Sequence, residues 1–160
     1  MTFSPGLEAR FERILEGCPA GRQRSALIPM LLYAQDETGA ITPELVEEIS
    51  RRLSLKPVEV EEAVSYYSML RKQPAGKHHI QICTNISCLL TGGEELWQHA
   101  CEKLGIGHKE VTADGQFSLE EVECIGACSW APAIQVNYDF RHAVTPEAFD
   151  RLIESLRKPD

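Results

Sequence analysis

Apolar residues recur at helical spacing through residues 7–70. The clearest positions are Leu27, Met30, Leu31 and Ala34 in one stretch and Leu45, Ile49 and Leu53 in the next. Residues three or four positions apart share one face of a helix, so each stretch predicts an amphipathic helix. We expect three or four short helices here, packed as a small bundle.

Local signals mark where these helices begin and end. Thr42-Pro43 and Lys56-Pro57 each predict a helix start, because proline at the first helical position loses no hydrogen bond. Gly39 is in a position that suits the end of the preceding helix.

Residues 73–77 interrupt the helical pattern with Pro74 and Gly76. Helix breakers of this kind are typical of a segment between domains. A chain of 160 residues has room for one ordinary domain, or for a compact domain with a small appendage. We therefore predict a helical N-terminal domain over residues 1–72 and a second domain over residues 73–160.

After this break the apolar period becomes that of strands. Residues 79–83 alternate and predict a strand that ends on Cys83. A helix is expected over residues 92–104, and Gly105 is in the usual stop position. Asp114-Gly115 predicts a tight hairpin turn between strands that reach as far as Cys124.

A strand at residues 133–137 and a helix at residues 145–156 complete the second half. The order strand, helix, strand, strand, strand, helix predicts a small central sheet with helices against it. Together with the helical first half, this order places the chain in the α+β class.

Four of the six cysteines form two local pairs, Cys83-x4-Cys88 and Cys124-x3-Cys128, in turn-like segments after predicted strands. A 2Fe-2S cluster needs two thiolates on each iron, with bridging sulfides in the other positions, so two local pairs meet its requirement. Gly126, inside the second pair, suits a loop whose backbone N–H groups approach sulfur. The leading interpretation is a redox protein.

The spacing separates this site from other metal sites. Plant-type ferredoxins group three cysteines before a distant fourth, whereas 35 residues separate the two pairs here. The chain has neither the C-x-H pairing of a Rieske centre nor the C-x-x-C of a thioredoxin-type redox site. Four-cysteine zinc sites tolerate the observed spacings, so structural zinc remains an alternative.

The formal charge of −8 argues against a nucleic-acid surface, which would require a basic stripe. Residues 1–72 carry 9 Lys or Arg against 11 Asp or Glu, whereas residues 73–160 carry 7 against 13. The cysteine-bearing half is therefore the acidic one. Carboxylates near a cluster disfavour an added electron and lower its potential, although the same carboxylates also keep a surface soluble.

The N-terminus has no apolar region of the kind that targeting signals contain, and no stretch approaches the roughly 18 apolar residues of a membrane span. We therefore expect a reducing, cytoplasmic setting without direct membrane insertion. In that setting cysteines serve as metal ligands or free thiols more often than as a disulfide framework.

A resemblance to a known family extends over nearly the whole chain. It rests on Cys83-Thr-Asn-Ile-Ser-Cys88, Val122-Glu-Cys-Ile-Gly-Ala-Cys128 and residues 112–117, 131–132 and 135–137, and in the N-terminal half on residues 25–29, 58–64 and 66–69. These segments resemble the thioredoxin-like 2Fe-2S ferredoxin family, and within it the NuoE-type subunits of NADH:quinone oxidoreductase (respiratory complex I).

The resemblance implies a helical extension on a thioredoxin-like domain, with a 2Fe-2S cluster held by Cys83, Cys88, Cys124 and Cys128. It also implies a partner, a NuoF-type flavoprotein that holds FMN and the NADH site. Through that partner the chain would join the remaining peripheral-arm subunits at the inner face of the cytoplasmic membrane. Equivalent subunits of NAD-linked hydrogenases and formate dehydrogenases share the motif, so the parent complex stays open.

Two further cysteines and two histidines are weaker candidates for a functional role. Cys101 lies on the apolar stripe of its predicted helix and is interpreted as a core thiol, and Cys18 as a free thiol at a helix end. We expect His78 and His79, at the entrance of a strand, to be polar edge residues, with proton transfer near the cluster as the alternative.

Three aromatic residues and one proline have either a structural role or a role in partner binding. Trp130 and Pro132 follow the last ligand candidate, and either shield the cluster or belong to a docking face. Tyr66 and Tyr67 end an apolar helix, and either pack between the two domains or contact a partner.

The chain lacks a G-x-G-x-x-G after a strand, a phosphate-binding P-loop and a nucleophile with a paired base. We therefore do not expect it to oxidise NADH alone. The three hypotheses are an electron-transfer subunit of NADH:quinone oxidoreductase, a free-standing electron carrier and a zinc-stapled interaction module. A free carrier would need no helical extension, which argues against the second.

Overall fold

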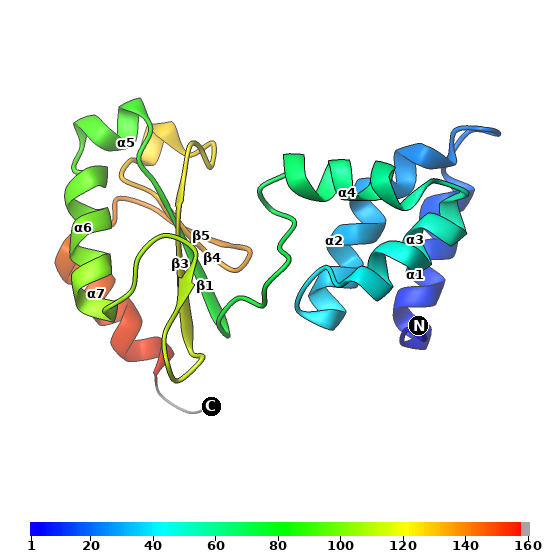
Figure 1. Ribbon diagram of the computed structural model, residues 1–160. Coiled ribbons are helices and arrows are strands. Elements are labelled where there is room, and N and C mark those ends of the chain that lie inside the picture. Colours follow the sequence, from blue (N-terminus) through cyan, green and yellow to red (C-terminus); the bar gives the residue numbers. More distant parts are fainter. Residues whose placement is uncertain (158–160) are drawn as a thin grey trace. The chain divides into compact units, whose positions relative to one another are not determined.

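The computed structural model describes residues 1–157 and divides the chain into two compact units, Met1–Pro74 and Ala75–Asp160 (Figure 1). The first unit is built from helices, and the second combines helices with a five-stranded sheet. The α+β class expected from the sequence is confirmed.

The first unit contains four α-helices and one short 3-10 helix among its described residues. They are α1 (Pro5–Glu16), η1 (Gln23–Ala26), α2 (Leu27–Thr38), α3 (Pro43–Leu53) and α4 (Pro57–Tyr66). The prediction of three or four short helices is confirmed.

The helix ends follow the local signals of the sequence. The Thr42 hydroxyl accepts a hydrogen bond from the Leu45 N–H at 3.3 Å, and Pro43 is the first residue of α3. Gly39 ends α2 with a φ of +82°, a conformation that costs glycine little. Pro57 begins α4 in the same way that Pro43 begins α3.

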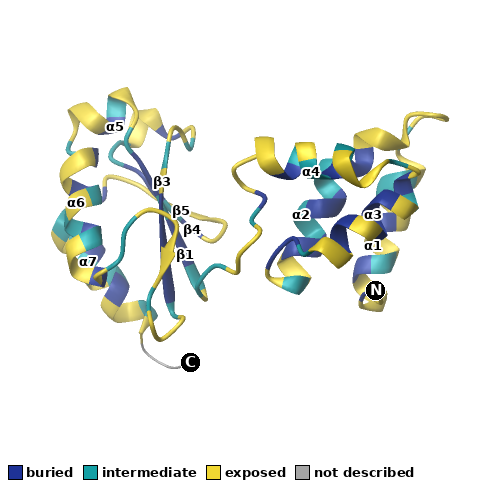
Figure 2. Ribbon diagram, viewed as in Figure 1, coloured by how far each residue is buried: buried dark blue, intermediate teal, exposed yellow. Residues whose placement is uncertain are grey.

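The apolar faces of these helices share one core. Its largest fully buried side chains are Phe11, Met30, Leu31, Leu45 and Ile49. Burying a side chain of this size contributes about 1.5–3 kcal/mol, so this core holds the short helices together. Figure 2 shows the buried positions on the helix sides that face one another.

One buried amide ties the segment after α4 back to α2. Gln35 donates a hydrogen bond to the Met69 carbonyl at 3.0 Å and accepts one from the Arg71 N–H at 2.6 Å. Both backbone groups are thereby satisfied. The segment therefore belongs to the first unit although it is not helical.

A charged network connects α1 and α3. The Glu48 carboxylate accepts hydrogen bonds of 2.6 Å from both Arg51 and Arg52, and Arg52 also binds Glu8 at 2.5 and 2.7 Å. The hydrogen bond from Arg51, supported by Arg52, lowers the pKa of Glu48 to about 2 against the opposing effect of burial.

The second unit is organised around a sheet of five strands in the order β2-β3-β1-β4-β5. The strands are β1 (His78–Cys83), β2 (Glu110–Val111), β3 (Phe117–Val122), β4 (Ile134–Val136) and β5 (Asp139–Arg141). β1 pairs with β3 in parallel, and the other three pairings are antiparallel. The strand that ends on Cys83 is therefore the central one.

Helices α6 (Gly93–Leu104) and α7 (Pro146–Leu156) lie together on one side of this sheet (Figure 1). The core between them and the sheet includes Ile80, Ile82, Leu96, Phe117, Leu119 and Phe149. Because side chains alternate along a strand, the neighbours of these apolar residues on β1 and β3 point to the opposite face.

Most elements predicted for the second half are confirmed. The Asp114-Gly115 turn joins β2 to β3, with Gly115 at a φ of +68°. Three described elements were not predicted: the five-residue helix α5 (Ile86–Leu90), the 3-10 helix η2 (Cys128–Trp130) and the edge strand β5. All three are too short for the apolar spacing to show a period. β3 also ends at Val122, so Cys124 lies beyond the strand.

None of the helices within residues 1–157 combines the length and the apolar character that a membrane span requires.

We expect Glu48→Gln to lower the free energy of unfolding of the first unit by about 1–2 kcal/mol at pH 7, because two arginines lose a charged acceptor. The stabilisation by the ionised carboxylate is present above the pKa of an unfolded glutamate, about 4.3. It is lost as the pH falls towards the folded pKa of about 2.

Urea unfolding followed by far-ultraviolet circular dichroism should therefore separate variant and wild type at pH 7, and separate them less at pH 3. The matched control is Glu47→Gln on the same helix, an exposed carboxylate outside the network. An equal effect of both substitutions would contradict the role assigned to the network.

Candidate metal centre

Parallel pairing of β1 and β3 brings the two cysteine-bearing segments to one edge of the sheet. Cys83, the last residue of β1, is in register with Val122, the last residue of β3, and Cys124 follows two positions later. Just beyond, the Thr84 N–H donates to the Val122 carbonyl at 3.3 Å. The carboxyl ends of parallel strands meet at the same edge, so segments far apart in the chain become neighbours.

Cys88 lies in the short helix α5. The Asn85 side chain caps this helix by accepting a hydrogen bond from the Ile86 N–H at 2.7 Å. Cys83 ends its strand as predicted, whereas the expectation of a turn-like segment is wrong for Cys88, which is helical. A capped five-residue helix gives no periodic signal in the sequence.

Gly93 permits the close packing of the first cysteine pair. A Cβ at this position would lie 2.8 Å from the carbonyl carbon and oxygen of Cys88, and 2.9 Å from the carbonyl oxygen of Cys83. These are backbone atoms that cannot move aside as a flexible side chain would, so the position requires glycine. Gly93 was not among the predicted site residues, although the Gly92-Gly93 dipeptide after Cys88 was a signal of close backbone approach.

In the second pair, Cys124 lies on the loop after β3, and Cys128 is the first residue of η2 (Cys128–Trp130). Gly126 adopts a φ of +74°, and its N–H donates to Cys124 Sγ at 3.3 Å. The thiols of Cys124 and Cys128 are both in exposed residues. The expected approach of a loop N–H group to sulfur is confirmed at Gly126, and it favours negative charge on that sulfur.

Cys83 and Cys88 are buried beside Ala127 and Ala133, in an apolar cluster separate from the core under α6 and α7. Burial raises the pKa of the Cys88 thiol, while a hydrogen bond from the Ala133 backbone acts in the opposite direction. The nearby thiols of Cys83 and Cys128 raise this pKa further. The fold thus brings three of the four predicted ligands together, and Cys124 lies on the same loop as Cys128.

The donor set of the site fits a two-iron cluster, because it consists of four free thiols in two local pairs. A 2Fe-2S cluster needs only two thiolates at each iron. The site offers two pairs of different character, one buried on β1 and α5 and one exposed on the loop.

Comparison with known proteins identifies the family. A family model described as thioredoxin-like [2Fe-2S] ferredoxin matches residues 11–157. The chain belongs to this ferredoxin family. NADH-quinone oxidoreductase subunit 2 of Thermus thermophilus is 46% identical over 140 residues, which cover 87% of this chain and 77% of that protein. An NADH-quinone oxidoreductase subunit of Rickettsia bellii is 39% identical over 147 residues, which cover 91% of this chain and 88% of that protein.

Among solved structures, an NAD+-reducing [NiFe]-hydrogenase in the H2-reduced state resembles this chain with a TM-score of 0.72. The identity is 23%, and the match covers 84% of this chain but only 23% of the hydrogenase chain. This likeness shows the fold alone. Together with the family match, it confirms the thioredoxin-like fold expected for the second half of the chain.

His79 occupies an unexpected place in this ferredoxin fold. It is 9% exposed on the central strand, with Nδ1 2.8 Å from the Ser118 hydroxyl oxygen and Nε2 3.1 Å from Glu120 Oε2. Gln81 also donates to that carboxylate, at 3.0 Å. Although burial raises the pKa of Glu120, the hydrogen bonds from His79 and Gln81 bring it below its usual value.

The expectation that His79 is a polar edge residue is therefore wrong. Its strand lies in the middle of the sheet, and a sequence does not show which strand is central. Nor does His79 lie beside the Cys83 thiol, because the two residues are four positions, about 13 Å, apart along the strand. Its contacts are those of a satisfied buried polar group.

The two cysteines outside the pairs have the surroundings expected of them. Cys101 packs half-buried against the core under α6, and burial raises the pKa of its thiol. Cys18 follows the end of α1, and its Sγ donates to the Ile14 carbonyl at 3.3 Å.

Large apolar side chains are exposed next to the candidate ligands of the ferredoxin site. Trp130, two residues after Cys128, is 60% exposed, and its ring lies 5.2 Å from that of His142. Ile86 and Leu90 on α5 are 68% and 80% exposed. This exposure supports the interpretation of Trp130 as part of a docking face.

We expect Gly93→Ala to reduce the iron-sulfur content of the purified protein several-fold, because the added methyl group displaces the backbone of Cys83 and Cys88. The matched control is Gly107→Ala, where the nearest atoms belong to the flexible Glu110 side chain at 3.5 Å. Iron content and visible absorption are the measurements. Normal cluster content in Gly93→Ala would show that this close approach is not needed.

Proposed function

We propose that this chain is the electron-transfer subunit of an NADH-quinone oxidoreductase, holding one 2Fe-2S cluster on Cys83, Cys88, Cys124 and Cys128. When bound, such a cluster accepts and donates single electrons. The observation that supports this most is the meeting of two cysteine pairs at one sheet edge, in a member of a [2Fe-2S] ferredoxin family.

The surroundings of the four candidate ligands bury one side of the site and expose the other. Burial of Cys83 and Cys88 keeps water from one side. The Gly126 N–H supports negative charge on the Cys124 sulfur. Exposure of Cys124 and Cys128 leaves the other side open, so an electron partner can approach there.

We infer that this partner is a NuoF-type flavoprotein that holds FMN and the NADH site. A hydride carries two electrons whereas a 2Fe-2S cluster takes one, so a flavin must stand between NADH and the cluster. The curated relatives are named as subunits of NADH-quinone oxidoreductase, and this sequence has no dinucleotide-binding motif of its own. We expect the complex at the inner face of the cytoplasmic membrane, with this chain on its cytoplasmic side.

The second candidate is the equivalent subunit of an NAD-linked hydrogenase or formate dehydrogenase. The likeness to the hydrogenase concerns the fold only, at 23% sequence identity. Sequence identities of 46% and 39% relate the chain to subunits of NADH-quinone oxidoreductase. We therefore favour NADH-quinone oxidoreductase. A zinc-stapled interaction module is the candidate of a different class, and metal analysis separates it from both.

Anaerobically purified protein is expected to be brown and to contain two irons and two acid-labile sulfides per chain.

Each of four single variants should lose or perturb the cluster, because each thiolate completes the coordination of one iron. These variants are Cys83→Ser, Cys88→Ser, Cys124→Ser and Cys128→Ser. The controls Cys18→Ser and Cys101→Ala should keep it, since both thiols lie outside the site. The measurements are the iron content and the paramagnetic resonance signal of the reduced protein. Stoichiometric zinc without visible absorption would contradict the assignment of a cluster.

Alone, the cluster-loaded chain should not oxidise NADH with ferricyanide as acceptor, because hydride transfer requires the flavin of the partner. Co-expressed with its flavoprotein, it should form a stable complex that carries this activity. Size-exclusion chromatography and NADH:ferricyanide assays test both points. NADH oxidation by the isolated chain, or the absence of any complex, would contradict the proposed division of labour.

A further inference from the structure

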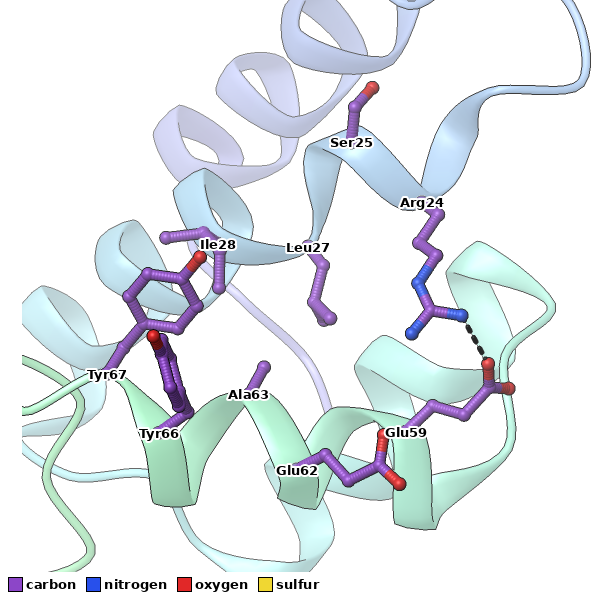
Figure 3. A pocket seen from close by; sticks show the side chains of 9 residues that line it. All are labelled: Arg24, Ser25, Leu27, Ile28, Glu59, Glu62, Ala63, Tyr66 and Tyr67. Atoms are coloured by element: carbon purple, nitrogen blue, oxygen red, sulfur yellow. Dashed lines mark hydrogen bonds and ion pairs between the residues drawn. The ribbon is translucent and has the colours of Figure 1, made fainter.

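The first unit carries a pocket that the cluster site does not use. Its volume is about 350 Å³, and it lies between α4 and the segment formed by η1 and the start of α2 (Figure 3). Leu27 and Ile28 line one side, and Ala63 on α4 lines the other. Pockets with such apolar walls and a few polar groups at the rim are where proteins bind ligands or partner side chains.

The α4 side of this pocket is a single helical stripe. Glu59, Glu62, Ala63 and Tyr66 follow one another at the spacing of neighbours on one helix face. An adjoining face of α4 buries Val60 and Val64 in the bundle core. The helix is thus anchored by one face and presents acidic and aromatic groups on the adjoining one.

Two large aromatic side chains of the pocket are exposed, Tyr66 and Tyr67 at the end of this helix. Tyr66 is 82% exposed, and its ring meets that of Tyr67 edge-on at 5.2 Å. Tyrosines held in this way at the edge of a pocket are typical anchor points of protein interfaces.

The charges of the pocket favour a basic occupant. Arg24 reaches across the pocket and pairs with Glu59, whose carboxylate also accepts the Lys56 N–H at 2.9 Å (Figure 3). Within the described residues, the exposed Glu62 carboxylate has no hydrogen bond or ion pair. Lining side chains therefore carry one uncompensated negative charge, on a chain whose net charge is −8.

We propose that this pocket is a docking site for a segment of the partner flavoprotein that presents an apolar side chain beside a lysine or arginine. The apolar side chain packs between Ile28 and the two tyrosines, and the cation pairs with Glu62. An acidic segment is disfavoured, because it would meet Glu62 with a like charge. The inference rests on the proposed function, since it takes the flavoprotein as the partner.

The test measures binding of the full-length, cluster-loaded chain to the purified FMN-containing flavoprotein by titration calorimetry. Glu62→Lys and Tyr66→Ser are each expected to raise the dissociation constant about tenfold or more. Raising the salt concentration should weaken binding of the wild type more than that of Glu62→Gln, because only the wild type keeps the ion pair. Visible absorption of the cluster and helical circular dichroism report whether each variant is folded.

Two matched controls share the surroundings without lining the pocket. Glu47→Lys makes the same charge change on the exposed side of α3, and Val58→Ser removes an exposed apolar side chain from α4 itself. Both should bind the flavoprotein as the wild type does. Controls that weaken binding as much as the pocket variants would overturn the assignment of the pocket.

Three further outcomes distinguish the claims. No binding by the wild-type chain would overturn the proposed function and this inference together. Normal binding by folded Glu62→Lys and Tyr66→Ser would overturn the inference alone. A wild-type dimer that these substitutions dissociate would identify a second copy of this chain as the occupant, and would also overturn it.

Discussion

The parallel pairing of β1 with β3 is the constraint on which the candidate metal centre depends. It sets Cys83 opposite Val122 at the end of both strands, and the loop carrying Cys124 and Cys128 starts directly beyond. A shift of this register would displace the two pairs relative to each other along the strand direction by about 3.3 Å per residue. It would also turn Ile80 and Ile82 out of the core, so packing against α6 and α7 fixes the register and with it the site.

Local chemistry explains how much of this fold could be predicted from the sequence. Thr42-Pro43 caps a helix, and Asp114-Gly115 turns a hairpin, through neighbours a few residues away. Such signals need no knowledge of the rest of the chain. The four candidate ligands were found in the same way, because their pairing in sequence reflects the two thiolates that each iron requires.

The features that the sequence did not predict are non-local. The burial of His79 follows from the central position of β1, which depends on pairing with β3 and β4 across many residues. The requirement for glycine at position 93 follows from the carbonyl groups of Cys83 and Cys88, which approach it only in the folded unit. A one-dimensional pattern records which side chains are apolar, but not which backbones will meet.

In the second unit, the apolar side chains that hold the fold together are buried, whereas those beside the candidate metal centre are exposed. On the sheet face under α6 and α7, large apolar side chains are buried and hold the unit together. Beyond the carboxyl ends of the strands the apolar side chains are exposed instead, although apolar surface is costly to leave in water. The exposed residues there are Cys124, Cys128, Trp130 and Leu90. An electron carrier must bring its redox site close to that of another protein, because electrons have to pass between the two. Exposed apolar groups beside exposed thiols are therefore consistent with a site that is finished only when a partner covers it.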